Sequence, residues 1–402
     1  MGQDGEIMAS ESPKRSNNTI GLAMTGGGAR GAYQAGVLKR IGEIKKFEGK
    51  AGPFTIIGGA SAGAVNGAAL AAGNHDFQLC TRWISQLWSH LHTKDVYRSD
   101  FGSLIPKAGR WLRDLSVGAI FGGGHAHSLL DASPLPIFLG KYLNCESIHK
   151  NVERGNIKAL SIAATNYSSG KTFFFVQGKD IPMWAKSRRV SVATEIRVEH
   201  ICASAAIPIV FQPVRVAHPY GADFFGDGCL RLTTPLSPVI RLGADRLLAI
   251  GVRTASPTED QPSVFVETPP LAQILGTTLN AIFLDHLDAD VEHLERLNQI
   301  VTKAHITAKN LEGISEPIKT VIPLVIKPSD DLGKVAENFT KNLPIPVRYL
   351  MEGLGTRKTP SADLMSYLLF DPDYTRALID MGYKDANTRI DEIENFLFAS
   401  NR

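Results

Sequence analysis

The chain has 402 residues, and its apolar (44%) and charged (21%) fractions are ordinary for a soluble globular protein of one large domain or two to three smaller ones. A formal net charge of +3 gives no electrostatic indication of nucleic-acid binding, and no apolar stretch is long enough for a transmembrane helix. The cysteines lack paired or metal-binding spacing, which is typical of thiols in a reducing compartment; they are Cys80, Cys145, Cys202 and Cys229. We therefore expect a cytoplasmic protein, either free or attached peripherally to a membrane surface.

The N-terminal region predicts a tail, a strand, a glycine loop and a helix. Residues 1–17 are polar, without the apolar core of a signal peptide, and we expect them to be disordered. Thr19–Met24 predicts a strand that runs into Gly26–Gly31, and a helix follows. A glycine loop between strand and helix is typical of anion-binding loops. It also matches a dinucleotide-binding motif, but no convincing acidic residue ends a second strand about 20 residues later.

Residues 54–70 predict a strand, a sharp turn and a helix of small residues, with Ser61 at the turn. Gly59-Ala-Ser-Ala-Gly63 matches the Gly-x-Ser-x-Gly pattern of a nucleophile elbow, in which the serine adopts a strained backbone conformation. The two flanking glycines let strand and helix pass close together. The free amides at the start of the helix favour negative charge at Ser61. The alternative is an ordinary turn in which Ser61 caps the helix.

Residues 77–127 change from a regular helix to an interrupted basic segment. Phe77–Leu91 predicts an amphipathic helix. Residues 95–127 are rich in glycine, and basic residues such as Arg110 interleave with apolar ones such as Trp111. This segment suits a lipid surface or a lid, and the simpler alternative is a helix packed on the core with its basic face in water. Two histidine pairs lack a third ligand nearby, so we favour loop or surface histidines over a metal site: His90 with His92, and His125 with His127.

Alternating strands and helices continue to residue 252. Leu160–Thr165 and Lys171–Gln177 predict strands, residues 199–206 predict a helix stopped by Pro208, and Arg246–Val252 predicts a buried strand. Residues 224–228 predict a turn that exposes the carboxylate of Asp227, and an ordinary turn aspartate is the alternative there. The alternation predicts a three-layer α/β/α architecture with a mostly parallel central sheet.

The remaining residues predict a mainly helical region. The prolines of residues 254–270 indicate a linker between units 18–253 and 271–402. Residues 271–307 predict one long amphipathic helix, and short helices follow it. Residues 321–327 have strand character and are able to extend the first sheet. Three polar side chains share one face of the long helix, where a solvated surface is favoured over a metal site: His286, Asp290 and His293.

Three of these features suit acyl transfer. Ser61 is placed as a nucleophile, the glycine loop offers free backbone N–H groups for an oxyanion hole, and Asp227 offers a carboxylate. The serine needs a base, which is usually a histidine. Three histidines follow Asp227 in the chain order of a Ser-His-Asp hydrolase, but they lie on the long predicted helix rather than on a loop after a strand; they are His286, His293 and His305.

These motifs, in this order, resemble those of the patatin-like phospholipase family. The resemblance covers roughly residues 19–253, with further matches at 130–135, 203–208 and 211–213. Residues 283–285 and 366–370 resemble the C-terminal extension of bacterial members. The resemblance implies a lipid acyl hydrolase, a phospholipase A or lysophospholipase, that works through an acyl-enzyme without metal or other cofactor. A phospholipid or lysophospholipid is then the expected partner, with a membrane surface or a second copy of the chain as further options.

The resemblance also implies a role for each motif residue. It assigns a Ser–Asp dyad without histidine, with Ser61 as nucleophile and Asp227 as its base. The implied oxyanion-hole amides belong to Gly27, Gly28 and Ala29, and Arg30 fixes their loop. The supporting motif positions are Gly26, Gly31, Gly59, Gly63 and Gly228. Cys229 departs from the family, which often has glycine or alanine there, so the placement of Asp227 depends on whether cysteine fits.

An aspartate needs help to act as a base, because its ordinary pKa is near 3.9. Burial raises the pKa by disfavouring the charged form. We expect Phe224, Phe225 and bound acyl chains to exclude water from Asp227, so that lipid binding strengthens the dyad. A lipid-binding or scaffold protein without catalysis is the alternative outside the enzymes.

Overall fold

The computed structural model describes residues 19–99, 128–254, 271–283, 286–303, 319–352 and 362–399. The tail predicted at 1–17, most of the basic segment 95–127 and all but Thr254 of the linker predicted at 254–270 lie outside the described residues. So do His125, His127 and His305. None of the helices in the described ranges has the length and apolar character needed to cross a membrane.

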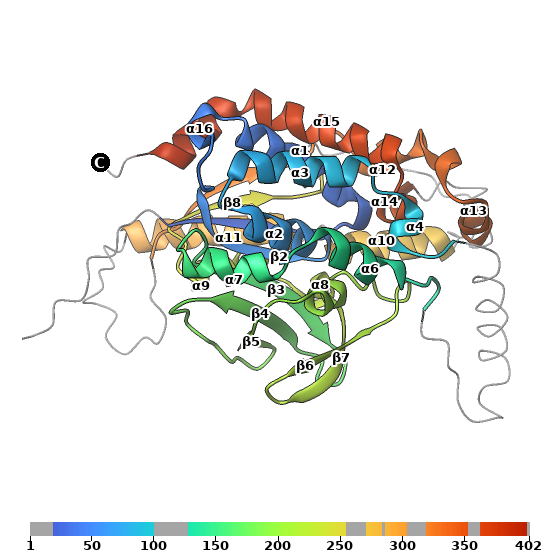
Figure 1. Ribbon diagram of the computed structural model, residues 1–402, viewed down its shortest axis with the longest axis horizontal. Coiled ribbons are helices and arrows are strands. Elements are labelled where there is room, and N and C mark those ends of the chain that lie inside the picture. Colours follow the sequence, from blue (N-terminus) through green and yellow to red (C-terminus); the bar gives the residue numbers. More distant parts are fainter. Residues whose placement is uncertain are drawn as a thin grey trace, which may run out of the picture.

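A nine-stranded sheet forms the centre of the molecule (Figure 1). Its strands are β1 (Ile20–Met24), β2 (Phe54–Ala60), β3 (Ala159–Asn166), β4 (Thr172–Gly178), β5 (Arg189–Ala193), β6 (Val214–His218), β7 (Gly221–Asp227), β8 (Arg246–Ile250) and β9 (Ile322–Ile326). The parallel strands β3, β2, β1, β8 and β9 lie in that order, and β4 continues the sheet antiparallel to β3. Every residue of β1, β3 and β8 is buried, as expected for strands covered on both faces.

Helices surround this sheet in both halves of the chain. The first half forms η1 (Gly28–Arg30), α1 (Gly31–Gly42), η2 (Lys45–Phe47), α2 (Ala62–Gly73), α3 (Phe77–Ser89), α4 (Thr93–Val96), α6 (Pro134–Tyr142), α7 (Glu146–Glu153), α8 (Val198–Ser204), η3 (Gly228–Arg231) and α9 (Ser237–Arg241). The second half forms α10 (Leu271–Phe283), α11 (His286–Lys303), α12 (Leu332–Glu337), η5 (Thr340–Asn342), α13 (Ile345–Met351), α14 (Ala362–Leu368), α15 (Pro372–Thr388) and α16 (Ile390–Phe398).

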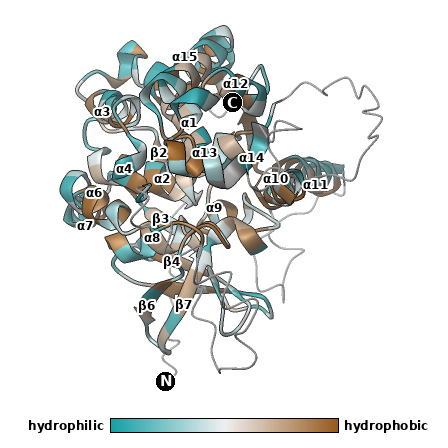
Figure 2. Cartoon of the chain, turned by 90° about the vertical axis from the view of Figure 1, so that its right-hand side faces the viewer, coloured by the Kyte–Doolittle hydropathy of each residue, from teal (hydrophilic) through white to brown (hydrophobic). Residues whose placement is uncertain are grey.

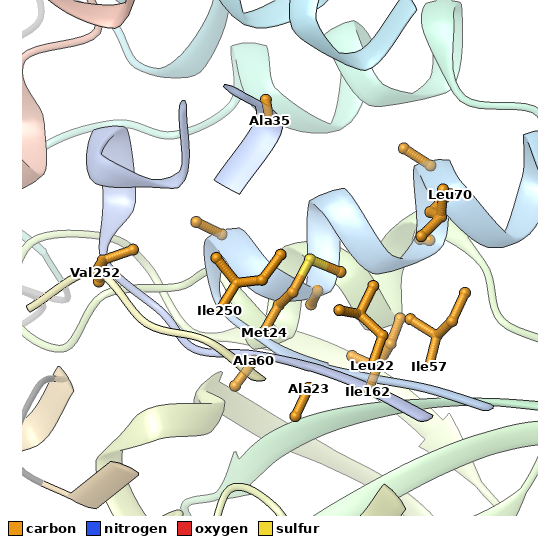
Figure 3. Packing of buried hydrophobic residues seen from close by; sticks show 14 of the residues in the cluster. Leu22, Ala23, Met24, Ala35, Ile57, Ala60, Leu70, Ile162, Ile250 and Val252 are labelled. Carbon is orange, nitrogen blue, oxygen red and sulfur yellow. The ribbon is translucent and has the colours of Figure 1, made fainter. Parts of the chain in front are cut away.

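The two faces of the central strands are covered by different helices. Leu22, Met24 and Ile57 point to the face that α2 covers, as Figure 3 shows, and Ala23 points to the other. On that other face Val239 of α9 comes so close that an added Cβ at residue 21 or 58 would lie 2.2 or 2.5 Å from its methyl carbons. Glycine at those two positions therefore lets α9 pack directly on β1 and β2. The mostly parallel sheet between helices confirms the predicted architecture.

Several elements differ from the sequence predictions. Residues 224–227 are the end of β7, which pairs antiparallel with β6, and β5, β6 and α12 were not predicted at all. Gly221 and Gly226 flank the aromatic residues of β7, and glycines at such positions are typical of a turn. The helix predicted as one unit over 271–307 contains two described helices, α10 and α11, with residues 284–285 between them outside the described ranges. The strand predicted at 321–327 is β9, which pairs in parallel with β8.

The C-terminal region packs on the sheet domain over a wide area. In Figure 1 α15 lies above α1 and α3. The close crossing of α1 and α15 depends on two glycines, because an added Cβ at Gly36 would lie 2.0 Å from the carbonyl oxygen of Ile379, and one at Gly382 would lie 2.2 Å from that of Tyr33. Residues beyond 320 therefore share the core of the first half.

Gly36→Ala should destabilise the protein by about 1–3 kcal/mol, because the new methyl group forces α1 and α15 apart. Gly140→Ala is the matched control: Gly140 is exposed within α6 with no other atom within 4 Å of an added Cβ, so the same change should stabilise by about 0.5–1 kcal/mol. Urea unfolding of the full chain measures both. Equal effects of the two substitutions would contradict the close crossing.

Candidate active site

Ser61 occupies a strained turn between β2 and α2. Its φ of 53° and ψ of −124° fall in a region that residues other than glycine rarely adopt. An added Cβ at Gly59 would lie 2.2 Å from the carbonyl oxygen of Gly63, and one at Gly63 would lie 2.2 Å from that of Met24. The two glycines of the motif are therefore required by the close approach of β1, β2 and α2, and the turn has the geometry expected of a nucleophile elbow.

Two buried polar side chains hold this turn, and sequence reasoning gave neither a role. The Ser61 backbone N–H donates to the Ser204 hydroxyl at 3.0 Å, from the last residue of α8. Asn66 of α2 donates to the carbonyl oxygen of Gly31 at 3.0 Å and accepts from the Trp88 ring nitrogen at 2.7 Å, which joins α1, α2 and α3. The sequence held one signal for these roles: each of the two polar residues stands among small apolar residues that are expected to be buried. A buried polar side chain needs a hydrogen-bond partner.

The register of the sheet brings Asp227 to Ser61. Ala60, at the end of β2, is opposite Ala163 of β3, and Asp227, at the end of β7, is opposite the next residue, Ala164. The other edge of β3 is taken by β4, so β7 must occupy the β2 side, beyond the end of β2. Ser61 and Asp227 are therefore neighbours although they are far apart in sequence.

The Asp227 carboxylate is completely buried, and this desolvation raises its pKa to about 7. Its Oδ1 accepts from the backbone N–H of Cys229 at 2.9 Å, whereas its Oδ2 has no hydrogen-bond partner in the described part of the chain. The nearby Ser61 hydroxyl and Cys229 favour the charged form and lower the pKa in part. Ser61 thus lies near Asp227 without a hydrogen bond of standard length, which is common in unliganded catalytic sites.

The surroundings of Asp227 correct one expectation and answer one question. Phe225 is buried, but Phe224 is 53% exposed and does not shield Asp227, because alternate residues of a strand point to opposite faces. Cys229 is accommodated: its sulfur lies beside Gly26, where an added Cβ would be 2.5 Å away. Gly228 is needed because a Cβ there would lie 2.2 Å from the carbonyl oxygen of Ala163.

The glycine loop lies next to Ser61 and starts a short helix. Gly28 has a φ of 55° and begins η1, so the first amides of η1 have no partner within that helix. Gly28 and Ser61 line the same cavity. Gly31 contacts the elbow, since an added Cβ there would lie 2.6 Å from that of Ala62. Among the described residues no hydrogen-bond acceptor is found for the backbone N–H groups of Gly27, Gly28 and Ala29, and their oxyanion-hole roles remain predictions.

The buried Arg30 side chain ties this loop to the C-terminal region. Its Nε donates to the Ser366 hydroxyl at 2.7 Å, one terminal nitrogen donates to Asp363 at 2.9 Å, and its guanidinium stacks over Tyr367 at 4.3 Å from the ring centroid. Burial disfavours the charge, but the tyrosines and Asp363 outweigh it and keep the pKa of Arg30 above its ordinary value. All three partners belong to α14, so the C-terminal helices complete the loop.

An apolar cavity opens beside Ser61, which we call the Ser61 cavity. It contains about 560 Å³ of empty space, part of it open to solvent. Apart from Ser61 and Gly28, the described residues that line it belong to α2, α3, α4 and α6 or are residues 91, 205, 207, 211 and 370; Trp88, Phe138 and Phe211 are among them. No described histidine lines it; His286 and His293 lie on α11, where Asp290 accepts from the backbone N–H of Leu236.

Comparison with known proteins supports one family. A family model described as patatin-like phospholipase matches residues 22–240, more than half of the chain, including the glycine loop, Ser61 and Asp227. One similar solved structure is VipD from Legionella pneumophila, with 16% identity and a TM-score of 0.31; the match covers 90% of this chain and 67% of that one. Another is a human GIVD cytosolic phospholipase A2 in complex with methyl gamma-linolenyl fluorophosphonate, with 12% identity and a TM-score of 0.41; the match covers 94% of this chain and 59% of that one. A third is the ExoU–SpcU heterodimer of Pseudomonas aeruginosa, with 13% identity and a TM-score of 0.27; the match covers 94% of this chain and 60% of that one. The chain therefore spans about three-fifths of the length of the last two structures. A search of curated proteins found no match.

The raised pKa of Asp227 predicts a stability cost that depends on pH. The unfolded carboxyl loses its proton near pH 3.8 and the folded one near pH 7, so stability falls as pH rises between these values, and the cost is complete above pH 7. Asp227→Asn should therefore be more stable than wild type at pH 8, by up to about 4 kcal/mol, and nearly equal to it at pH 4. Urea unfolding at both pH values measures this, with the exposed Asp180→Asn as control. Equal stability of Asp227→Asn and wild type at pH 8 would show that the carboxylate is not desolvated.

Proposed function

The chain belongs to the patatin-like phospholipase family, and on that premise we propose that it cleaves phospholipid or lysophospholipid acyl esters through a Ser61–Asp227 dyad. Membership of the family makes it a lipid acyl hydrolase. The observation that carries the finer assignment is the meeting of a strained serine and a desolvated carboxylate at the wall of an apolar cavity.

Each group has one task in the proposed reaction. Asp227 accepts the proton of the Ser61 hydroxyl, and the serine oxygen attacks the ester carbonyl carbon. The N–H groups of Gly27, Gly28 and Ala29 donate to the oxyanion, while α2 directs its positive end toward the same charge. Protonated Asp227 gives its proton to the leaving alkoxide, and an acyl-enzyme remains. Water, deprotonated by Asp227, then releases the fatty acid and regenerates Ser61.

Burial suits Asp227 to both halves of this reaction. A carboxyl group with a pKa near the working pH is able to accept a proton and to return it, which a surface aspartate does poorly. An acyl chain in the Ser61 cavity removes further water, because the cavity lies against Ser61. Lipid binding should therefore strengthen the base.

We also propose that the protein works in the cytoplasm at membrane surfaces. Its four cysteines are free thiols, which suits a reducing compartment, and its substrates reside in membranes. Recovery of the natural protein only from the extracellular medium would contradict this.

The dyad is tested by hydrolysis of a p-nitrophenyl acyl ester and of a phospholipid, in chelator, by wild type, Ser61→Ala and Asp227→Asn. Both variants should lose at least about a thousandfold in kcat, with Asp180→Asn as the unaffected control. Wild-type kcat/KM should rise with pH through about 7, where Asp227 of the free enzyme becomes ionised. The corresponding limb of kcat, which reports Asp227 in the substrate complex, should shift upward for long-chain esters relative to short-chain ones.

Other outcomes assign other functions. If Asp227→Asn remains active, another base exists, and His286, His293 and His305 should be replaced in turn. A well-folded wild type that hydrolyses no ester would instead support a lipid-binding or scaffold protein.

Arg30→Lys should lower kcat by roughly ten- to a hundredfold with little change in KM, because lysine lacks the fork that reaches Ser366 and Asp363 together and the oxyanion loop is displaced. Arg40→Lys is the matched control: Arg40 also belongs to the first helical region, but its half-buried side chain bonds, among the described residues, only to Asn387 of α15. Steady-state kinetics on the short-chain ester measures both. Unchanged kcat in Arg30→Lys would show that α14 does not position the loop.

A further inference from the structure

A second apolar cavity lies behind one wall of the Ser61 cavity. It is lined by α10, α14 and residues 129–130 and 208–210, and we call it the α10–α14 cavity. It encloses about 550 Å³ of empty space, similar to the Ser61 cavity. Figure 2 shows α10 and α14 at the side of the molecule, where they pack together.

At two places a single chain segment separates the two cavities. Ile207 and Phe211 line the Ser61 cavity, whereas the three residues between them line the α10–α14 cavity. The same division occurs after α14, where Leu368 faces the second cavity and Phe370 faces the first. At each of these two places only one chain segment lies between the cavities.

A strained residue builds this partition. Ile209 has a φ of 69°, which is rare for a β-branched residue, and it is 53% exposed. Backbone hydrogen bonds hold it: the N–H of Leu129 donates to the Ile209 carbonyl at 2.9 Å, and that of Leu130 donates to the Val210 carbonyl at 2.8 Å. Strain of this kind persists where surrounding contacts determine the conformation, and it often marks a ligand site.

The residues that line the α10–α14 cavity favour a hydrocarbon ligand. Leu275, Leu279 and Ile282 recur at helical spacing along α10, opposite leucines of α14. Among the described lining residues, the single side-chain hydroxyl belongs to Thr278, and it already donates to the Ile274 carbonyl at 2.8 Å. None of the described residues that line the cavity is charged, so a head group gains nothing from them, whereas each buried CH₂ group favours binding.

We propose that the α10–α14 cavity holds the second acyl chain of a two-chain lipid whose reacting chain occupies the Ser61 cavity. This rests on the proposed function, and it makes a diacyl phospholipid the preferred substrate over a lysophospholipid. The argument for this occupant is continuity: the second cavity adjoins the reacting-chain cavity across the segment 207–211, and the two chains of such a lipid start from neighbouring carbon atoms.

The test fills the second cavity with a larger side chain. Leu275→Trp places an indole in the lining, and Leu271→Trp, one turn earlier on the same helix at an exposed position, is the matched control. We expect Leu275→Trp to lower kcat/KM at least tenfold on long-chain phosphatidylcholine and less than twofold on lysophosphatidylcholine, with Leu271→Trp unchanged on both. Equal effects of Leu275→Trp on the two substrates would overturn the proposal. Ile282→Trp replaces Leu275→Trp if thermal unfolding shows the latter misfolded.

A binding measurement separates this inference from the proposed function. Fluorescent one-chain and two-chain phosphatidylcholine analogues are titrated into Ser61→Ala with and without Leu275→Trp. Loss of at least tenfold in affinity for the two-chain lipid alone supports the second-chain site even if wild type hydrolyses nothing. Binding of two molecules of a fluorescent fatty acid, one of them lost in Leu275→Trp, would overturn the assignment in favour of a separate fatty-acid site.

Discussion

The removal of one carboxylate from water is the constraint on which this site depends. Asp227 has one bonded oxygen and one without a partner among the described residues, in a position where ionisation is costly. The sheet keeps Asp227 in this buried position. β7 pairs with the part of the β3 edge that β2 leaves free, and Asp227 is the last residue of β7. The chemical result is a pKa near 7, which suits Asp227 to the role of base in the reaction that we propose.

The first half of the chain does not build the site alone. The loop that faces Ser61 turns inward through Gly28, whose missing side chain lets the Tyr367 carbonyl approach, and Arg30 spans from the loop to α14. The α1–α15 crossing holds the same C-terminal region against the sheet. Catalytic geometry and global packing are therefore coupled, and loosening either should disturb the other.

The apolar space is arranged around the same strained segments. Ser61 and Ile209 both have positive φ, and each stands at the wall of a cavity. Rigid surroundings keep both residues in costly conformations, and Ser204 and the pairing of residues 129–130 with 209–210 are part of those surroundings. The site thus combines fixed polar groups with space for hydrocarbon, as lipid chemistry requires.

The sequence by itself determined the local structures whose signals are short-range. The Gly-x-Ser-x-Gly turn, the glycine loop, the parallel strands and the strand at 321–327 follow from sterics and periodicity within a few residues. Only the tertiary structure decided that β7 reaches the end of β2, that Phe224 points away from Asp227, that Ser204 holds the elbow and that Arg30 binds α14. Those facts depend on strand register and on contacts between distant segments. Strand register and contacts between distant segments leave no periodic pattern in the sequence. Both depend on which surfaces are buried against each other in the folded protein.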